Sequence, residues 1–94
     1  MNRDAAFYFA NLGADVSRCL QALKQGSEGR YRDSLERAYR TLGYLRTAGR
    51  PEAYEEGLLM LRGLDFARAT PEMRAPFEAA LNSLVGAFSL RFVP

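Results

Sequence analysis

The sequence predicts an all-α protein, and the simplest arrangement is an antiparallel four-helix bundle with residues 1–94 as one helical domain. Three observations lead to this fold class. Apolar residues recur every three or four positions along most of the chain, short runs of turn formers separate four such segments, and β-branched residues are few. Helices of this length joined by short loops pack most simply as antiparallel neighbours.

The first two predicted helices each carry a single apolar stripe. The first is expected at about residues 4–25, and its stripe consists of Ala5, Phe9, Leu12, Val16, Cys19 and Leu23. The second is expected at about residues 30–48, with Tyr31, Leu35, Ala38, Leu42 and Leu45 on its stripe. Residues 26–29 are turn formers that can reverse the chain, and Gly49 is placed to end the second helix in a left-handed conformation.

The last two helices are marked by prolines. Pro51 is well placed as the first residue of a helix at about 51–68, and Thr70 with Pro71 predicts the start of a fourth helix at about 71–90. Pro76 complicates the fourth helix, which is expected either to kink there or to begin near Ala75. The third helix is apolar over much of its circumference, so it is expected to be buried on several sides or covered by a second chain.

Two short patterns partly resemble a tetratricopeptide repeat. Phe9, Leu12 and Gly13 recur in the same spacing as Tyr39, Leu42 and Gly43. The residues that loosely follow the second helix of such a repeat are Gly29, Tyr31, Ser34 and Ala38. This resemblance implies two stacked helical hairpins and peptide binding in a concave groove, although the family repeats every 34 residues. Alternatively, Gly13 and Gly43 simply allow neighbouring helices to approach closely.

Several kinds of chemistry have no support in the residues present. The chain has no histidine and a single cysteine, and its glycines form no phosphate-binding loop. Cys19 falls on the apolar stripe and is interpreted as a core residue. We therefore expect no enzymatic activity, no catalytic residue, no metal and no cofactor. No apolar stretch is long enough for a membrane span, and a cytoplasmic location is expected.

The second predicted helix is rich in arginine. Residues 18–50 carry eight basic and three acidic side chains, although the net charge of the chain is only +2. Arg30, Arg37 and Arg40 lie opposite the apolar stripe, and Tyr44 joins them, which is a pattern suited to phosphate contacts and base stacking. RNA binding through these four residues is one functional hypothesis. The pairs Asp33–Arg37 and Glu36–Arg40 have the spacing of intrahelical ion pairs, which would neutralise part of the cluster.

The favoured hypothesis is a non-enzymatic interaction module. It self-associates, or binds another helical protein or a peptide, through apolar positions that a single bundle does not obviously cover. The candidate interface consists of Leu59, Met60, Leu64, Leu90, Phe92 and Val93. A third hypothesis is a carrier of an apolar ligand held between the helices.

Overall fold

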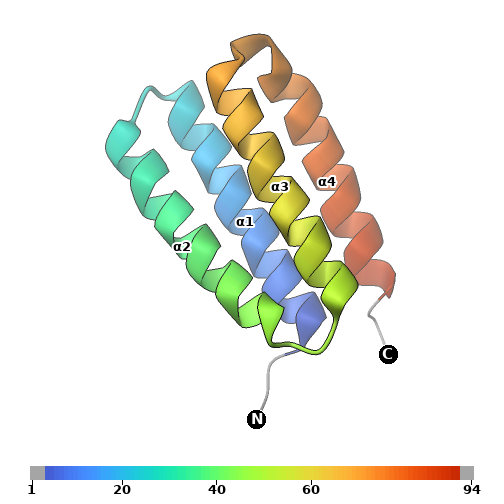
Figure 1. Ribbon diagram of the computed structural model, residues 1–94. Helices are drawn as coiled ribbons and strands as arrows, with labels where there is room; N and C mark the ends of the chain where they lie inside the picture. The colour runs from blue at the N-terminus through green and yellow to red at the C-terminus, as the bar shows by residue number, and fades with distance from the viewer. Residues whose placement is uncertain (1–3, 92–94) are drawn as a thin grey trace.

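Four α-helices and one short 3-10 helix make up the described part of the chain. The computed structural model describes the backbone of residues 4–91 and the side chains of residues 4–87. The helices are α1 (Ala5–Lys24), α2 (Glu28–Arg46), α3 (Pro51–Ala69) and α4 (Arg74–Arg91), and the 3-10 helix η1 (Pro71–Met73) precedes α4. Consecutive helices run antiparallel (Figure 1), so the predicted all-α fold is confirmed.

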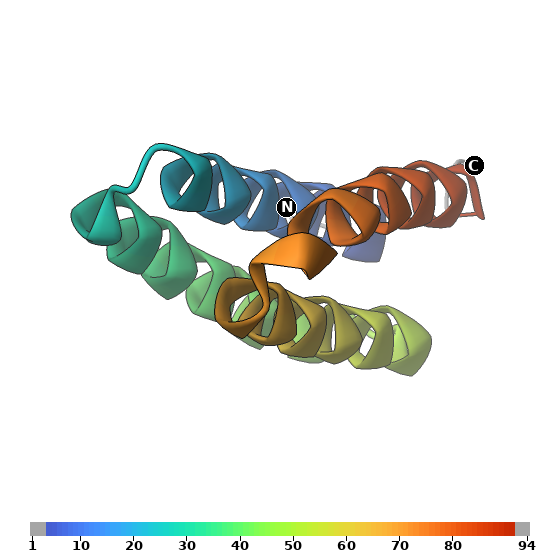
Figure 2. The same ribbon diagram turned by 90° about the horizontal axis from the view of Figure 1, so that it is seen from above.

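The helices form two layers, with α1 beside α4 in one layer and α2 beside α3 in the other (Figure 2). Because α4 packs back against α1, the arrangement is that of a bundle. Both α1 and α3 contact each of the other three helices, whereas α2 and α4 make no close backbone approach within the described residues. The prediction that the third helix is buried on several sides is therefore confirmed.

Side-chain caps set where the first two helices begin. The carboxylate of Asp4 accepts a hydrogen bond from the backbone N–H of Phe7 at 2.9 Å. Ser27 Oγ accepts one from the N–H of Arg30 at 3.3 Å. Serine and aspartate favour this position because their oxygen satisfies an N–H that has no partner inside the helix. The cap at Ser27 starts α2 at Glu28, two residues before the predicted start.

Two glycines with positive φ end α1 and α2. Gly26 has a φ of +69° and Gly49 a φ of +80°, which confirms the predicted left-handed residue at Gly49. At Gly26 the turn is closed by two backbone hydrogen bonds, from the N–H of Gly26 to the carbonyl of Leu23 and from the N–H of Ser27 to the carbonyl of Ala22. These bonds satisfy carbonyls at the end of α1 and reverse the chain within a few residues.

Of the two predicted alternatives for the fourth helix, a start at Pro71 with a kink at Pro76 is wrong, and a start near Ala75 is confirmed. Pro71 instead begins η1, and α4 begins at Arg74, which places Pro76 in its first turn. A proline deeper inside an α-helix would remove a hydrogen bond and clash with the carbonyl four residues earlier, and in the first turn it does neither. Arg74 also donates hydrogen bonds to the carbonyls of Ala67 at 3.1 Å and Arg68 at 3.0 Å, at the end of α3.

The two recurring sequence patterns occupy different environments. A Cβ added at Gly13 would lie 2.5 Å from Val85 Cγ2, so this glycine does allow α1 and α4 to approach closely. Gly43 has no such neighbour within 4 Å, and the prediction of a close contact there is wrong. Phe9 is fully buried whereas Tyr39 is largely exposed. The packing therefore gives no support to an internal repeat.

Candidate functional site

The first candidate site is a polar groove between α1 and α2. We call it the arginine groove and define it by Arg18 from α1 and by Arg30, Arg37, Arg40 and Tyr44 from α2. It consists of two adjoining depressions of about 300 and 380 Å³, and both Arg18 and Arg37 line each of them. Each of the four residues predicted to contact nucleic acid thus lines at least one of these two depressions.

Asp15 lies in the groove and is almost completely buried. Its Oδ1 is 2.9 Å from Arg18 Nη1 and 3.9 Å from Arg37 Nε, and its Oδ2 accepts a hydrogen bond from Thr41 Oγ1 at 3.3 Å. A buried carboxylate is costly unless cations and donors compensate it, which these three side chains do. Asp15 therefore joins α1 to α2 and holds two arginines at the middle of the groove.

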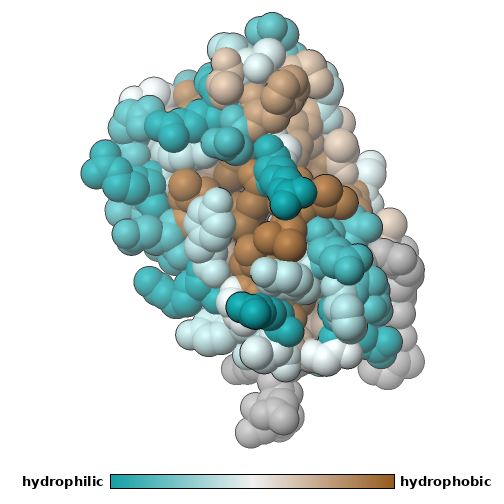
Figure 3. Space-filling model, viewed as in Figure 1, coloured by the Kyte–Doolittle hydropathy of each residue, from teal (hydrophilic) through white to brown (hydrophobic). Residues whose placement is uncertain are grey.

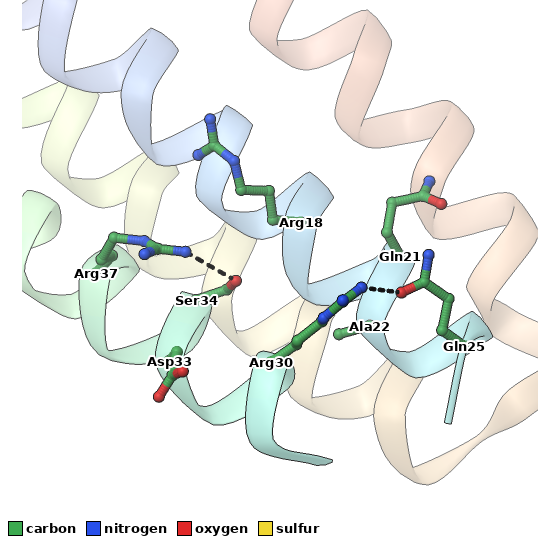
Figure 4. Close-up of a pocket in the computed structure, with 8 residues that line it drawn as sticks. All are labelled: Arg18, Gln21, Ala22, Gln25, Arg30, Asp33, Ser34 and Arg37. Atoms are coloured by element: carbon green, nitrogen blue, oxygen red, sulfur yellow. Dashed lines mark hydrogen bonds between the residues drawn. The ribbon is translucent and has the colours of Figure 1, made fainter. Parts of the chain in front are cut away.

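Hydrogen bonds orient the arginines at one end of the groove (Figure 4). Arg30 Nη1 donates to Gln25 Oε1, just beyond the end of α1, at 3.0 Å, and Arg37 Nη2 donates to Ser34 Oγ at 3.4 Å. Among the described residues, no ion pair forms between Asp33 and Arg37 or between Glu36 and Arg40, in contrast to the prediction. The carboxylate that approaches Arg37 is Asp15, on the other helix.

The other end of the groove is aromatic. The ring of Tyr44 lies on the ring of Tyr8 from α1, with centroids 5.5 Å apart and an angle of 32° between their planes. Phe7 meets Tyr8 edge to face at 5.4 Å. Tyr44 nevertheless remains 51% exposed. Its contact with Tyr8 holds the ring in place while much of its surface faces solvent.

The second candidate site is the outward surface of α3, which we call the α3 face and define by Leu58, Leu59, Arg62 and Phe66. Leu59 is 56% exposed and Phe66 57% exposed. These two side chains are seven residues apart, so they project from the same side of the helix. Phe66 was not predicted as an interface residue, although its helical spacing from Leu59 would have identified it.

The other five residues of the predicted interface are not on the α3 face. Met60 and Leu64 are buried in the core of the single chain. They face inward on α3, between α1 and the neighbouring helices, and are not available at the surface of this structure. The side chain of Leu90, and residues Phe92 and Val93, lie outside the described part of the chain. Of the six predicted residues, Leu59 is the one that the structure places on an exposed surface.

A depression of about 260 Å³ adjoins the α3 face on the side of α2. It is lined by Tyr39 from α2 and by Leu58, Leu61, Arg62 and Asp65 from α3. The same side of the molecule shows hydrophobic atoms near its centre with hydrophilic side chains around them (Figure 3). Tyr39 is 57% exposed and extends the apolar surface from α3 onto α2.

Cys19 is fully buried, as predicted from its place on the apolar stripe. Burial raises the pKa of its thiol from 9.0 to about 11, and the nearby charge of Asp15 acts in the same direction. The thiol lies 3.9 Å from the carbonyl oxygen of Tyr31. A protonated and inaccessible thiol is a poor nucleophile, so Cys19 is a packing residue.

Comparison with known protein families, curated proteins and solved structures finds no match to this chain. Within the described residues, no helix combines the length and the apolar character that crossing a membrane requires. The arginine groove and the α3 face are therefore the features of this chain that indicate a function.

Proposed function

We propose that this chain is a non-enzymatic helical interaction module that pairs with a second copy of itself along the α3 face. The observation that carries the proposal is the exposure of Leu59 and Phe66 on one side of a helix whose other side is buried. Large apolar side chains grouped on a surface and surrounded by polar groups are typical of protein interfaces.

The positions of the two side chains favour an antiparallel pair of α3 helices. Leu59 and Phe66 are equally far from the midpoint between Arg62 and Gly63. A two-fold axis through that midpoint would place Leu59 of each copy against Phe66 of the other. Such a contact is self-complementary, as an interface between two identical chains must be.

The charges along α3 favour the same orientation. Residues 51–60 contain three glutamates and no basic residue, whereas residues 61–69 contain two arginines and one aspartate. An antiparallel pair brings the glutamates of one helix towards the half of the other helix that carries Arg62, whereas Arg68 already pairs with Glu28 of its own chain at 3.0 Å. A parallel pair would bring like charges together, which disfavours it.

The expected association is weak. Burying four side chains that are now about half exposed contributes about 3–7 kcal/mol, which is comparable to the roughly 4–15 kcal/mol that association costs in lost freedom. Contacts from Tyr39 and Leu58 have to supply the remainder. We therefore expect a dimer that forms in the high micromolar range.

Sedimentation equilibrium between about 10 µM and about 1 mM tests the proposal. The unmodified chain should show a concentration-dependent dimer, and Leu59→Gln or Phe66→Gln should shift it to the monomer. Met73→Gln is a matched control, because Met73 is a partly exposed apolar residue outside the α3 face. A chain that remains monomeric at the highest concentration would contradict self-association.

Cross-linking tests the orientation. In a mixture of Leu59→Cys and Phe66→Cys chains, an antiparallel pair should oxidise mainly to the mixed disulfide. A parallel pair would give the two homodimers instead. The native Cys19 does not interfere because it is buried.

The hypothesis of an apolar ligand between the helices stays a prediction. Core side chains such as Phe9, Leu12 and Leu64 are fully buried against one another in the described chain.

A further inference from the structure

The arginine groove is not part of the proposed α3 pairing. It opens between α1 and α2, and its residues are distinct from those that line the α2–α3 depression. Four arginines against two aspartates, Asp15 and Asp33, leave the groove with a net charge of +2, which equals the formal net charge of the whole chain. The groove thus concentrates the positive charge of the protein on one side of the bundle.

Asp15 leaves most of the donors of its two arginines available. A guanidinium has five N–H donors in a planar fork, and Asp15 approaches one nitrogen of Arg18 and one of Arg37. Both arginine side chains remain more than half exposed. Asp15 therefore acts as a positioning residue that directs the two guanidinium groups along the groove, and their remaining donors can bind an anion.

The groove is elongated along the helix axis. Arg30 and Tyr44 are fourteen residues apart on α2, which corresponds to about 21 Å at 1.5 Å per residue. Arg37 and Arg40 lie between them, and Arg18 faces them from α1. At about 3.4 Å per stacked nucleotide, this length matches about six nucleotides of a single strand.

Tyr44 adds a feature that a simple anion would not need. Its ring is supported on one side by Tyr8, while half of its surface remains exposed. A base stacked on the exposed side would continue the aromatic pair. Stacking platforms beside a positively charged groove are the usual means of binding single-stranded nucleic acid without sequence preference.

We propose that the arginine groove binds a single-stranded nucleic acid segment of about six nucleotides, with phosphates on the arginines and a base on Tyr44. An acidic peptide would leave the aromatic end unused, and a lipid surface would contact a flat face more readily than a groove between two helices. The site is independent of the α3 pairing, so Leu59→Gln should bind nucleic acid as the unmodified chain does.

Fluorescence anisotropy with a labelled eight-nucleotide oligo(U) and an oligo(dT) of equal length tests the proposal. If each of the four arginines contacts one phosphate, the logarithm of the association constant should fall with the logarithm of salt concentration with a slope of about −2.8. Arg40→Glu should weaken binding at least about fivefold and reduce the slope to about −2.1. Comparable binding of both oligonucleotides supports a site that contacts phosphates and bases and makes no use of the 2′-hydroxyl. A preference for oligo(U) supports RNA as the ligand.

Two matched controls separate the groove from net charge. Arg32→Glu makes the same charge change on the same helix but outside the groove, so it should weaken binding no more than about twofold. Tyr44→Leu keeps an apolar contact with Tyr8 and removes the planar ring, so it should weaken binding about tenfold. Tyr44→Phe keeps the ring and should bind normally.

Several results would overturn the proposal. Binding that is undetectable at about 25 mM salt would remove it. Equal losses for Arg32→Glu and Arg40→Glu would show attraction by net charge without a groove. Polyphosphate that competes as well as oligo(U), together with an unchanged affinity for Tyr44→Leu, would show an anion site that makes no use of bases.

Discussion

Replacing Gly57 with alanine tests the packing at the centre of the bundle. Gly57 is buried on the inner side of α3, where a Cβ would lie 2.8 Å from Leu12 Cδ2, 3.0 Å from Leu42 Cδ1 and 3.2 Å from Leu45 Cδ2. These methyl groups come from α1 and α2, and Leu12 and Leu45 are fully buried. The new methyl group can fit only if several leucines or two helices move apart.

The expected loss follows from two opposing contributions. Alanine in place of glycine in the interior of a helix stabilises it by about 1 kcal/mol. Overpacking a core by one methyl group typically costs about 1–3 kcal/mol. The steric cost is at least as large as the gain in helix propensity. Gly57→Ala should therefore lower the free energy of unfolding by up to about 2 kcal/mol.

Gly43→Ala is the matched control. Gly43 lies within α2 and is exposed, and an added Cβ would meet no atom within 4 Å apart from the adjoining backbone of its own helix, so this variant should gain about 1 kcal/mol from helix propensity alone. The two variants should differ in Tm by roughly 5 to 20 °C. Thermal unfolding followed by circular dichroism at low micromolar concentration measures the difference without a contribution from self-association. Equal stability of the two variants would refute the close approach of α1, α2 and α3 at Gly57.

Further predictions concern three polar or ionisable groups, Asp15, Cys19 and Arg74. Asp15→Ala should cost about 1–2 kcal/mol in urea unfolding, because its partners are partly exposed, whereas the exposed Asp33→Ala should change stability by less than about 0.5 kcal/mol. The Cys19 thiol should react with a disulfide reagent at pH 8 only as fast as the chain unfolds. Because the pKa of Cys19 is raised from 9.0 to about 11 in the folded chain, ionisation favours the unfolded state as pH rises between these values. Stability should then fall by up to about 3 kcal/mol, a loss that Cys19→Ala should not share. Arg74→Met should cost about 1–2 kcal/mol, measured by the same unfolding assay, because it removes two hydrogen bonds to the end of α3.

The two candidate sites differ in how far local sequence could predict them. The positions of Arg30, Arg37, Arg40 and Tyr44 on one side of a helix follow from helical periodicity, and the structure places them in one groove. Arg18 and Asp15 complete that groove from another helix. No spacing within α2 could reveal them, because their contribution depends on how α1 packs beside α2.

For the α3 face, the local sequence could not predict which apolar residues are exposed. The surplus of apolar residues on the third helix was evident, but the helix contacts three neighbours, which cover Met60 and Leu64 and leave Leu59 and Phe66 exposed. Periodicity gives the angle of each side chain around its own helix. It does not tell which angles are covered, because that depends on the positions of the other helices.

The sequence by itself determined the helical class, the approximate extent of each helix and the turns at Gly26 and Gly49, because caps, periodicity and left-handed glycines act over a few residues. Only the tertiary structure decided that α1 and α3 lie at the centre and that Asp15 bridges Arg18 and Arg37. These features arise from contacts between residues far apart along the chain, whose energies no local pattern contains.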